Sequence, residues 1–237
     1  MPLLLIWLAY AASDKLADAL PARFDAELAR PFWAQLEASP ERCRAGSAPQ
    51  YLDALVQPLL SAAGDSPFEY RFLVLKDPVV NAFALPGGYV VVNLGLLQAA
   101  QSGEEVAAVL AHEISHVQLR HGSRRLLRTL GGSLVLSWLL GSSDPGVLIG
   151  ALRELESKRH DRGEEADADT EGLALLASAG ISPQGMASFF ERLAQQASPP
   201  ALLSTHPDPG TRAERARQAS GRTTAQLPAL PASWTCE

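Results

Sequence analysis

The sequence is poor in cysteine and has only a short apolar run at its start. Two of the 237 residues are cysteine, Cys43 and Cys236, so at most one internal disulfide can form. Neither cysteine has the spacing of a metal-ligand pair. The apolar run of residues 3–12 is about half the roughly 20 residues that a membrane-spanning helix requires. A disulfide-rich scaffold and a membrane span formed by this run alone are therefore excluded.

Basic residues are also scarce. Lys and Arg number 20 against 26 Asp and Glu, which gives a formal net charge of −6. A nucleic-acid-binding protein usually needs a basic stripe to neutralise phosphates, so we expect no nucleic-acid partner. The apolar fraction of 47% is high enough to bury a sizeable core, and the length fits one domain.

Two features leave alternatives open. The run of residues 3–12 has no positive charge before it, so it does not match a secretory signal. It is either an N-terminal helix packed on the protein or the end of a membrane anchor. Likewise, Cys43 and Cys236 are either two free thiols or a bridge formed in an oxidising compartment.

The order of elements predicts a mostly helical α+β fold. Residues 14–64 have a helical pattern, and residues 68–95 alternate in the manner of strands around a turn at Pro86, Gly87 and Gly88. We therefore expect a small antiparallel sheet. We divide the chain into an N-terminal helical extension, residues 1–66, that packs on a compact catalytic unit, residues 67–237.

Three further helical segments follow the sheet. Ser102 with Glu105 three residues later forms a capping box, which predicts a helix from this point to about Gly122. Residues 126–150 read as an apolar helical hairpin that either covers a core or groove or inserts into a membrane. A long helix is expected from about Leu152 to Ala179, because Gly180 follows it directly.

The capped helix contains a metal-binding pattern. His112, Glu113 and His116 form a His-Glu-x-x-His sequence, whose spacing of four places both imidazoles on one helix face. Two such histidines can share one zinc ion, while Glu113 beside them can act as general base. A helix with two ordinary surface histidines is the alternative.

Catalytic zinc takes three protein ligands and keeps a fourth position for water, so one ligand is missing. A histidine six residues after His116 would supply it in one class of zinc protease, but that position is Gly122. A carboxylate from a second helix is the other standard solution. Glu165 and Asp169 are four residues apart, so one can bind zinc while the other orients a ligand histidine.

Four ordered motifs closely resemble metallopeptidase family 48, the gluzincins that include the CAAX prenyl endopeptidase and HtpX. Over residues 68–215 they read NAFALPGGYVVVNLGLL, AAVLAHEISHVQLRHG, EEADADTEGLALLASAG and LSTHPDPGTR. The resemblance implies a zincin-like (gluzincin) fold with the active site on the His-Glu-x-x-His helix. It also implies peptide-bond hydrolysis with one zinc ion per chain.

The resemblance assigns residues to roles. His112, His116 and the first Glu of a Glu-x-x-Ala-Asp motif would bind zinc. Glu165 fits that motif with Asp169 and the following Gly172, whereas the alternative register would place Gly163 at the ligand position; Glu164 is the alternative if the helix is shifted. The His206-Pro207 pair and Arg212 resemble groups that stabilise an oxyanion, and Asp169 and Arg212 are supporting groups.

Residues Asn81, Ala82, Phe83, Ala84 and Leu85 would by resemblance form the edge strand that pairs with an extended substrate, although an ordinary hairpin edge is the alternative. His121 is expected to be a helix-end residue that faces away from the ligands. His206 read without the family would be an ordinary surface histidine.

These expectations add up to a zinc metalloendopeptidase whose substrates are misfolded or membrane-associated proteins. The alternative function is a non-catalytic, chaperone-like binder of unfolded or membrane proteins. We expect a bacterial cell-envelope location facing the periplasm, with a cytoplasmic one as the alternative. Contact with a membrane surface would involve residues 3–12 and 126–150.

Overall fold

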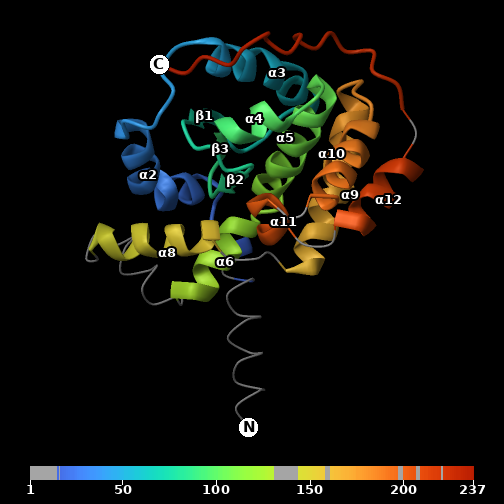
Figure 1. Ribbon diagram of the computed structural model, residues 1–237. Helices are drawn as coiled ribbons and strands as arrows, with labels where there is room; N and C mark the ends of the chain where they lie inside the picture. Colours follow the sequence, from blue (N-terminus) through green and yellow to red (C-terminus); the bar gives the residue numbers. More distant parts are fainter. Residues whose placement is uncertain are drawn as a thin grey trace.

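The computed structural model describes residues 15, 17–130, 144–157, 161–196, 200–206, 209–219 and 221–237. The elements within these ranges are α2 (Arg23–Ala38), α3 (Ser47–Ala63), β1 (Arg71–Leu75), β2 (Ala82–Leu85), β3 (Tyr89–Asn93), α4 (Leu94–Ala99), α5 (Gly103–Gln118), α6 (His121–Leu130), α8 (Pro145–Ser157), α9 (Arg162–Ser178), α10 (Gln184–Ala194), α11 (Ala201–Thr205) and α12 (Pro209–Gln218). The predicted mostly helical α+β fold is confirmed (Figure 1).

The sheet has the strand order β1-β3-β2 and is mixed. β2 pairs with β3 in the antiparallel sense, as predicted, but β1 pairs with β3 in the parallel sense. The antiparallel prediction was therefore wrong for β1, because the chain leaving β1 passes to the far edge before β3 returns between the two strands. The turn from β2 to β3 contains Gly87 at φ 85°, and a Cβ at this position would lie 2.2 Å from the Cα atom of Ala26 in α2. Only glycine allows this close approach.

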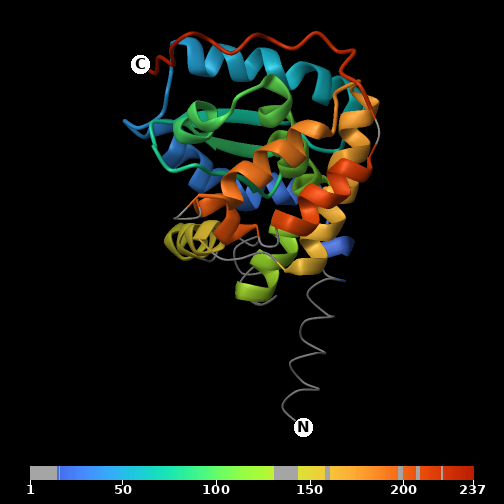
Figure 2. The ribbon, with the colours of Figure 1, turned by 45° about the vertical axis from the view of Figure 1, so that its right-hand side comes forward.

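Helices cover both faces of the sheet (Figures 1 and 2). On one face, Val90 and Val92 of β3 pack into a large core with side chains of α3, α5 and α10. On the other face, Phe83 and Val91 pack against α2, α6 and α8, with Trp33 stacked on Tyr89 at a centroid distance of 4.7 Å. The sheet therefore separates a core beneath α5 from a second core beneath α2.

Ser102 is the N-cap of α5 as predicted, although Glu105 reaches back to the residue before Ser102 rather than to Ser102 itself. The Ser102 hydroxyl accepts from the Glu105 N–H, and the Glu105 carboxylate accepts from the Gln101 N–H. The helix ends at Gln118 rather than at Gly122, because Arg120 adopts the left-handed conformation at φ 57° and turns the chain into α6. Gly122 lies inside α6 against Pro86.

Of the two predictions for the region after α5, the long helix needs correction and the hairpin of residues 126–150 lies partly outside the described residues. The long helix expected from Leu152 to Ala179 was wrong: α8 ends at Ser157, and α9 begins after Asp161, whose carboxylate accepts from the Gly163 N–H at 2.7 Å. The two ends of the predicted hairpin are helical in α6 and α8, while residues 131–143 lie outside the described residues. Residues 3–12 also lie outside them. Among the described helices, none combines the length and apolar character that crossing a membrane would require.

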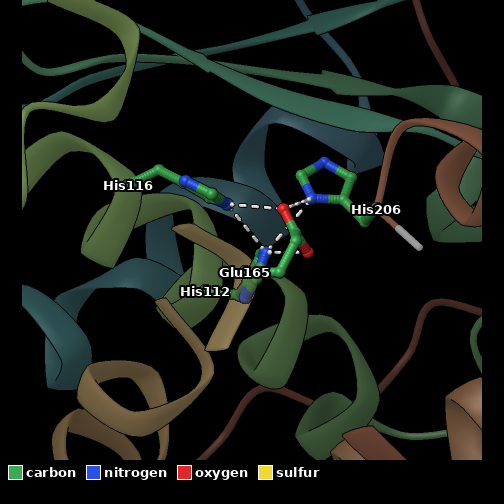
Figure 3. Close-up of side chains that lie close together, drawn as sticks. All are labelled: His112, His116, Glu165 and His206. Carbon is green, nitrogen blue, oxygen red and sulfur yellow. Dashed lines mark hydrogen bonds and ion pairs between the residues drawn. The ribbon is translucent and has the colours of Figure 1, made fainter. Parts of the chain in front are cut away.

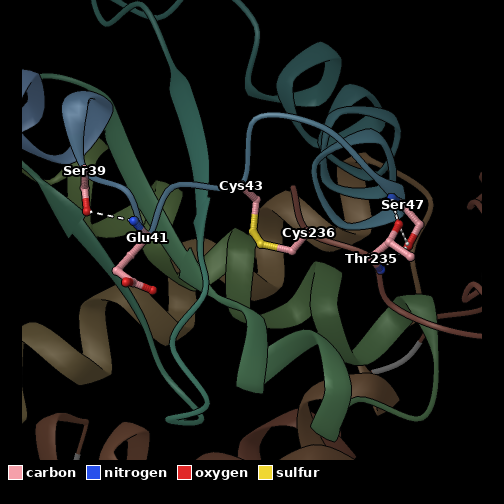
Figure 4. Close-up of a disulfide and its surroundings, with 6 residues drawn as sticks. All are labelled: Ser39, Glu41, Cys43, Ser47, Thr235 and Cys236. Carbon is pink, nitrogen blue, oxygen red and sulfur yellow. Dashed lines mark hydrogen bonds between the residues drawn. A yellow bond between two sulfur atoms is a disulfide. The ribbon is translucent and has the colours of Figure 1, made fainter.

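The C-terminal residues cross over α3 and end beside the segment that joins α2 to α3 (Figures 1 and 2). A disulfide joins Cys43 to Cys236 with a Cα–Cα distance of 4.8 Å (Figure 4). The carbonyl oxygen of Glu237 accepts from the Arg44 N–H at 2.6 Å, and the Thr235 hydroxyl accepts from the Ser47 N–H at 2.8 Å. The bridged alternative for the two cysteines is therefore confirmed.

Candidate metal centre

Four buried side chains converge at one point of the molecule (Figure 3). His112, His116, Glu165 and His206 each offer one ligand atom, and these atoms all lie within 4.8 Å of one another. The first two come from α5, the third from α9, and His206 follows directly after α11. The sequence predicted the first three as a ligand set, and the structure brings them together.

The two histidines of α5 lie one turn apart with their rings on the same side. Their Nε2 atoms are 2.9 Å from each other, and both point toward the carboxylate of Glu165. The Glu165 oxygens lie 3.4 Å from His112 Nε2 and 3.3 Å from His116 Nε2. Spacing of four on a helix accounts for this placement.

The second helix reaches the site because it packs closely on the first. A Cβ at Gly172 would lie 3.3 Å from the backbone N and Cα of His112, so glycine lets α9 approach α5 at the ligand itself. This contact supports the register that places Glu165 in the site. Glu164, the alternative, instead pairs with Arg128 of α6 at 2.9 Å.

The structure places His206 inside the donor cluster, which the sequence did not predict. Its Nδ1 lies 2.9 Å from Glu165 Oε1 and 3.2 Å from His112 Nε2. Its backbone N–H donates to the Leu202 carbonyl oxygen at 2.9 Å, which fixes His206 at the end of α11. The sequence indicated an oxyanion group here; Pro207, the other half of that motif, lies outside the described residues.

Asp169 and Arg212 form a buried pair behind His112. Asp169 Oδ1 lies 3.0 Å from His112 Nδ1 and accepts from the Arg212 guanidinium at 2.9 Å. A second guanidinium nitrogen lies 3.4 Å from Glu165 Oε2, and the guanidinium carbon lies 4.0 Å above the Phe190 ring. Arg212 thus contacts the carboxylates of both Asp169 and Glu165. Asp169 is placed to accept from His112 Nδ1–H and so to fix the tautomer of His112.

His121 is a site residue that the sequence analysis missed. It is buried at the start of α6, and its Nδ1 lies 2.8 Å from His116 Nδ1. Burial lowers the pKa of His121 to about 4, so its neutral ring can accept the His116 Nδ1–H, which makes Nε2 the nitrogen of His116 that carries the lone pair for a metal. The prediction that His121 faces away from the ligands was wrong, because the left-handed turn at Arg120 directs its ring toward His116.

The pKa values of the two histidines of α5 are shifted in opposite directions. For His112, burial and Arg212 oppose protonation, but Glu165 and the hydrogen bond to Asp169 raise its pKa to about 9. Burial and the charge on His112 hold the pKa of His116 well below its ordinary value. Burial opposes ionisation of Glu165, but His206 and His112 hold its pKa well below the ordinary range, so it carries a negative charge.

Glu113 lies beside the cluster without joining it. It is buried, and its Oε1 is 3.5 Å from His206 Nε2. Burial raises the pKa of Glu113, and the charges of His206 and His112 offset this only in part. A carboxylate whose pKa is raised toward neutrality suits a general base.

The donor set fits zinc. Imidazole nitrogens with one carboxylate are ligands that zinc accepts in tetrahedral geometry. Three of the four donors would leave a position open for water, as a catalytic site requires, whereas all four would close the coordination shell. Asp169 and His121 on the far sides of the histidine rings supply the outer hydrogen bonds that zinc sites use.

The predicted substrate strand lies at the sheet edge. Ala82–Leu85 form β2, with β3 on one side only, and Asn81 precedes the strand. The Asn93 N–H donates to the Asn81 carbonyl oxygen, so alternation along the antiparallel pair turns the backbone groups of Ala82 and Ala84 outward. The edge position is consistent with the prediction, and substrate pairing stays a prediction.

The chain is similar to known proteins over most of its length. The family model of peptidase family M48 matches residues 47–220. The putative beta-barrel assembly-enhancing protease of Vibrio cholerae is 36% identical over 193 residues, which cover 71% of this chain and 39% of that protein. The beta-barrel assembly-enhancing protease of Escherichia coli K12 is 33% identical over 184 residues, covering 71% and 38%.

Metalloprotease LoiP of Escherichia coli K12 is 32% identical over 162 residues, which cover 64% of this chain and 62% of that protein. The chain spans about two-fifths of the length of the two assembly-enhancing proteases. The family match includes both helices that carry the donor cluster, and the chain therefore belongs to peptidase family M48, a family of metallopeptidases.

Proposed function

We propose that this chain is a zinc-dependent endopeptidase, with His112, His116 and Glu165 as zinc ligands. The observation that carries the proposal is the convergence of these side chains from two helices into one buried cluster. Zinc, when bound, supplies a Lewis acid and lowers the pKa of water. Family membership supports a proteolytic role.

The chain's own residues take the remaining roles in this proposal. Glu113 is placed beside the cluster and takes the proton from the attacking water. His206 Nε2 lies near Glu113, so His206 either donates to the oxyanion, as the sequence indicated, or completes the metal shell. Asp169 and Arg212 hold His112 and Glu165 in position.

The test is a comparison of zinc content and casein hydrolysis in the wild type and in Glu113→Gln. We expect Glu113→Gln to keep about one zinc per chain and to lose hydrolysis by 10²-fold or more, because general-base catalysis typically contributes about 10²–10⁴-fold. Full activity in this variant would contradict the assignment of Glu113. A metal-free and inactive wild type that still binds unfolded casein would favour the alternative, a chaperone-like binder.

For the location, we propose the bacterial cell envelope with the domain facing the periplasm, and a cytoplasmic location as the alternative. The disulfide supports an oxidising compartment, and two relatives are named for enhancing beta-barrel assembly. We therefore propose misfolded or membrane-associated envelope proteins as substrates. Mass spectrometry of alkylated native protein tests the location: two labelled thiols would contradict it.

We also keep the proposed division into an extension of residues 1–66 and a catalytic unit of residues 67–237. α2 and α3 each pack on one face of the sheet, which supports a packing role for this part. Deletion of residues 1–66 should lower the melting temperature of the protein, and the shortened protein should still bind zinc. Loss of zinc binding with unchanged stability would contradict the division.

A further inference from the structure

A cavity of about 680 Å³ lies beside the start of β2, between α2, α8 and α11. Phe32 and Leu36 of α2 form apolar walls, and Arg153 of α8 stands at its margin with its guanidinium donating to Gln35 at 3.1 Å. Thr205, the residue before His206, lines the opposite side. The volume falls in the range of pockets that hold small ligands or large side chains.

The cavity adjoins β2, the edge strand of the sheet, which has β3 on one side only. Along a strand, alternate side chains point to the same face, so Asn81 shares its face with Phe83 and Leu85. These two pack on the α2 and α8 side of the sheet, and the cavity opens on that side. The Leu202 N–H donates to the Val80 carbonyl oxygen at 3.2 Å, so α11 contacts the chain two residues before β2 begins at Ala82. A chain paired with Ala82 and Ala84 would therefore have a side chain beside the cavity.

Asn81 gives the cavity a chemical preference. The residue is only 7% exposed, and it lines the cavity. Its Oδ1 has no hydrogen-bond partner among the residues that the structure describes. A buried acceptor without a partner is costly, so a ligand that brings a hydrogen-bond donor would satisfy Asn81 Oδ1.

We propose that this cavity is a specificity subsite for a tyrosine or tryptophan side chain of the substrate polypeptide. The apolar walls of Phe32 and Leu36 would hold the aromatic ring, and Asn81 Oδ1 would accept from the phenol O–H or the indole N–H. Phenylalanine fits the same walls but leaves Asn81 without a partner. The subsite rests on the proposed peptidase function, which it makes more specific.

The test profiles cleavage sites in a denatured proteome digest by mass spectrometry, using the full zinc-loaded chain. In the wild type, tyrosine and tryptophan should be enriched over phenylalanine about 3- to 10-fold at one fixed position from the cut, the range expected for one neutral hydrogen bond. Asn81→Leu should abolish this preference while cleavage beside phenylalanine persists. Asn81→Asp, which keeps an acceptor, should retain it.

Asn93→Leu is the matched control, because Asn93 is an equally buried amide at the opposite position in β3 and does not line the cavity. It should keep the wild-type preference. Ser204→Phe should narrow the cavity and reduce cleavage beside all three aromatic residues.

The outcomes separate this inference from the proposed function. Absence of cleavage by the wild type overturns the peptidase function and the subsite with it. Cleavage without aromatic enrichment at any position, or an equal loss of preference in Asn93→Leu, overturns the subsite alone.

Discussion

Replacing Asp169 with Asn tests whether the buried pair behind His112 tunes the metal centre. The carboxylate lies 3.0 Å from His112 Nδ1 and 2.9 Å from Arg212, so the substitution keeps the shape and removes the negative charge. Without that charge, His112 becomes a weaker ligand and its Nδ1–H orientation is held less firmly. Loss of such an outer partner typically costs about 10–100-fold in metal affinity. We expect a zinc affinity lower by this factor, about 1.4–2.7 kcal/mol.

Stability should fall as well. Arg212 is buried and would lose the charge of its nearest carboxylate, while its longer contact with Glu165 at 3.4 Å remains. Removing one member of a buried pair costs about 3–5 kcal/mol. Because asparagine still offers an acceptor, we expect a smaller loss of about 1–3 kcal/mol in the unfolding free energy of the metal-free protein.

The assay is a competition titration with a chromophoric chelator, together with denaturant unfolding of the metal-free protein. Glu164→Gln is the matched control, since this carboxylate lies on the same helix and pairs with Arg128 away from the cluster. It should bind zinc as the wild type does. A zinc affinity within about twofold of wild type for Asp169→Asn would falsify the reasoning.

Three further predictions follow from the site and the disulfide. Glu165→Gln should lower zinc affinity at least 100-fold while Glu164→Gln should not, measured by chelator competition; equal losses would contradict the register. Because a ligand histidine must be neutral, the pKa of about 9 at His112 means that zinc affinity rises about tenfold per pH unit up to pH 9, and calorimetry in two buffers should detect one proton released at pH 7. Reducing Cys43–Cys236 should cost about 3–5 kcal/mol of unfolding free energy; an unchanged denaturation midpoint would contradict this.

Local sequence was enough to predict three of the four side chains that meet in the donor cluster. The spacing of His112 and His116 fixes their common face through helix geometry alone. Glu165 was chosen partly because Gly172 follows it, and the structure gives the physical reason: glycine lets the second helix touch the first at His112. Each prediction depended on residues within a few turns of one another.

Other parts of the site depend on how distant segments meet. His121 is five residues after His116, which on one continuous helix would place it off the ligand face, but the left-handed turn at Arg120 reverses this. His206 enters the cluster because Leu202 of α11 is hydrogen-bonded to Val80, two residues before β2, a contact between distant parts of the chain. Asp161 could have been recognised as an N-cap that divides α8 from α9, since a side-chain acceptor there satisfies the Gly163 N–H.

The disulfide closes most of the chain into a covalent ring, because Cys43 and Cys236 are 193 positions apart. A single cut anywhere between these two cysteines would leave both fragments attached. Such a nicked molecule would migrate as one band on a non-reducing gel and as two after reduction. With the bond in place, a cleavage that would otherwise separate two fragments is a break within one covalent molecule, whose helices can stay packed.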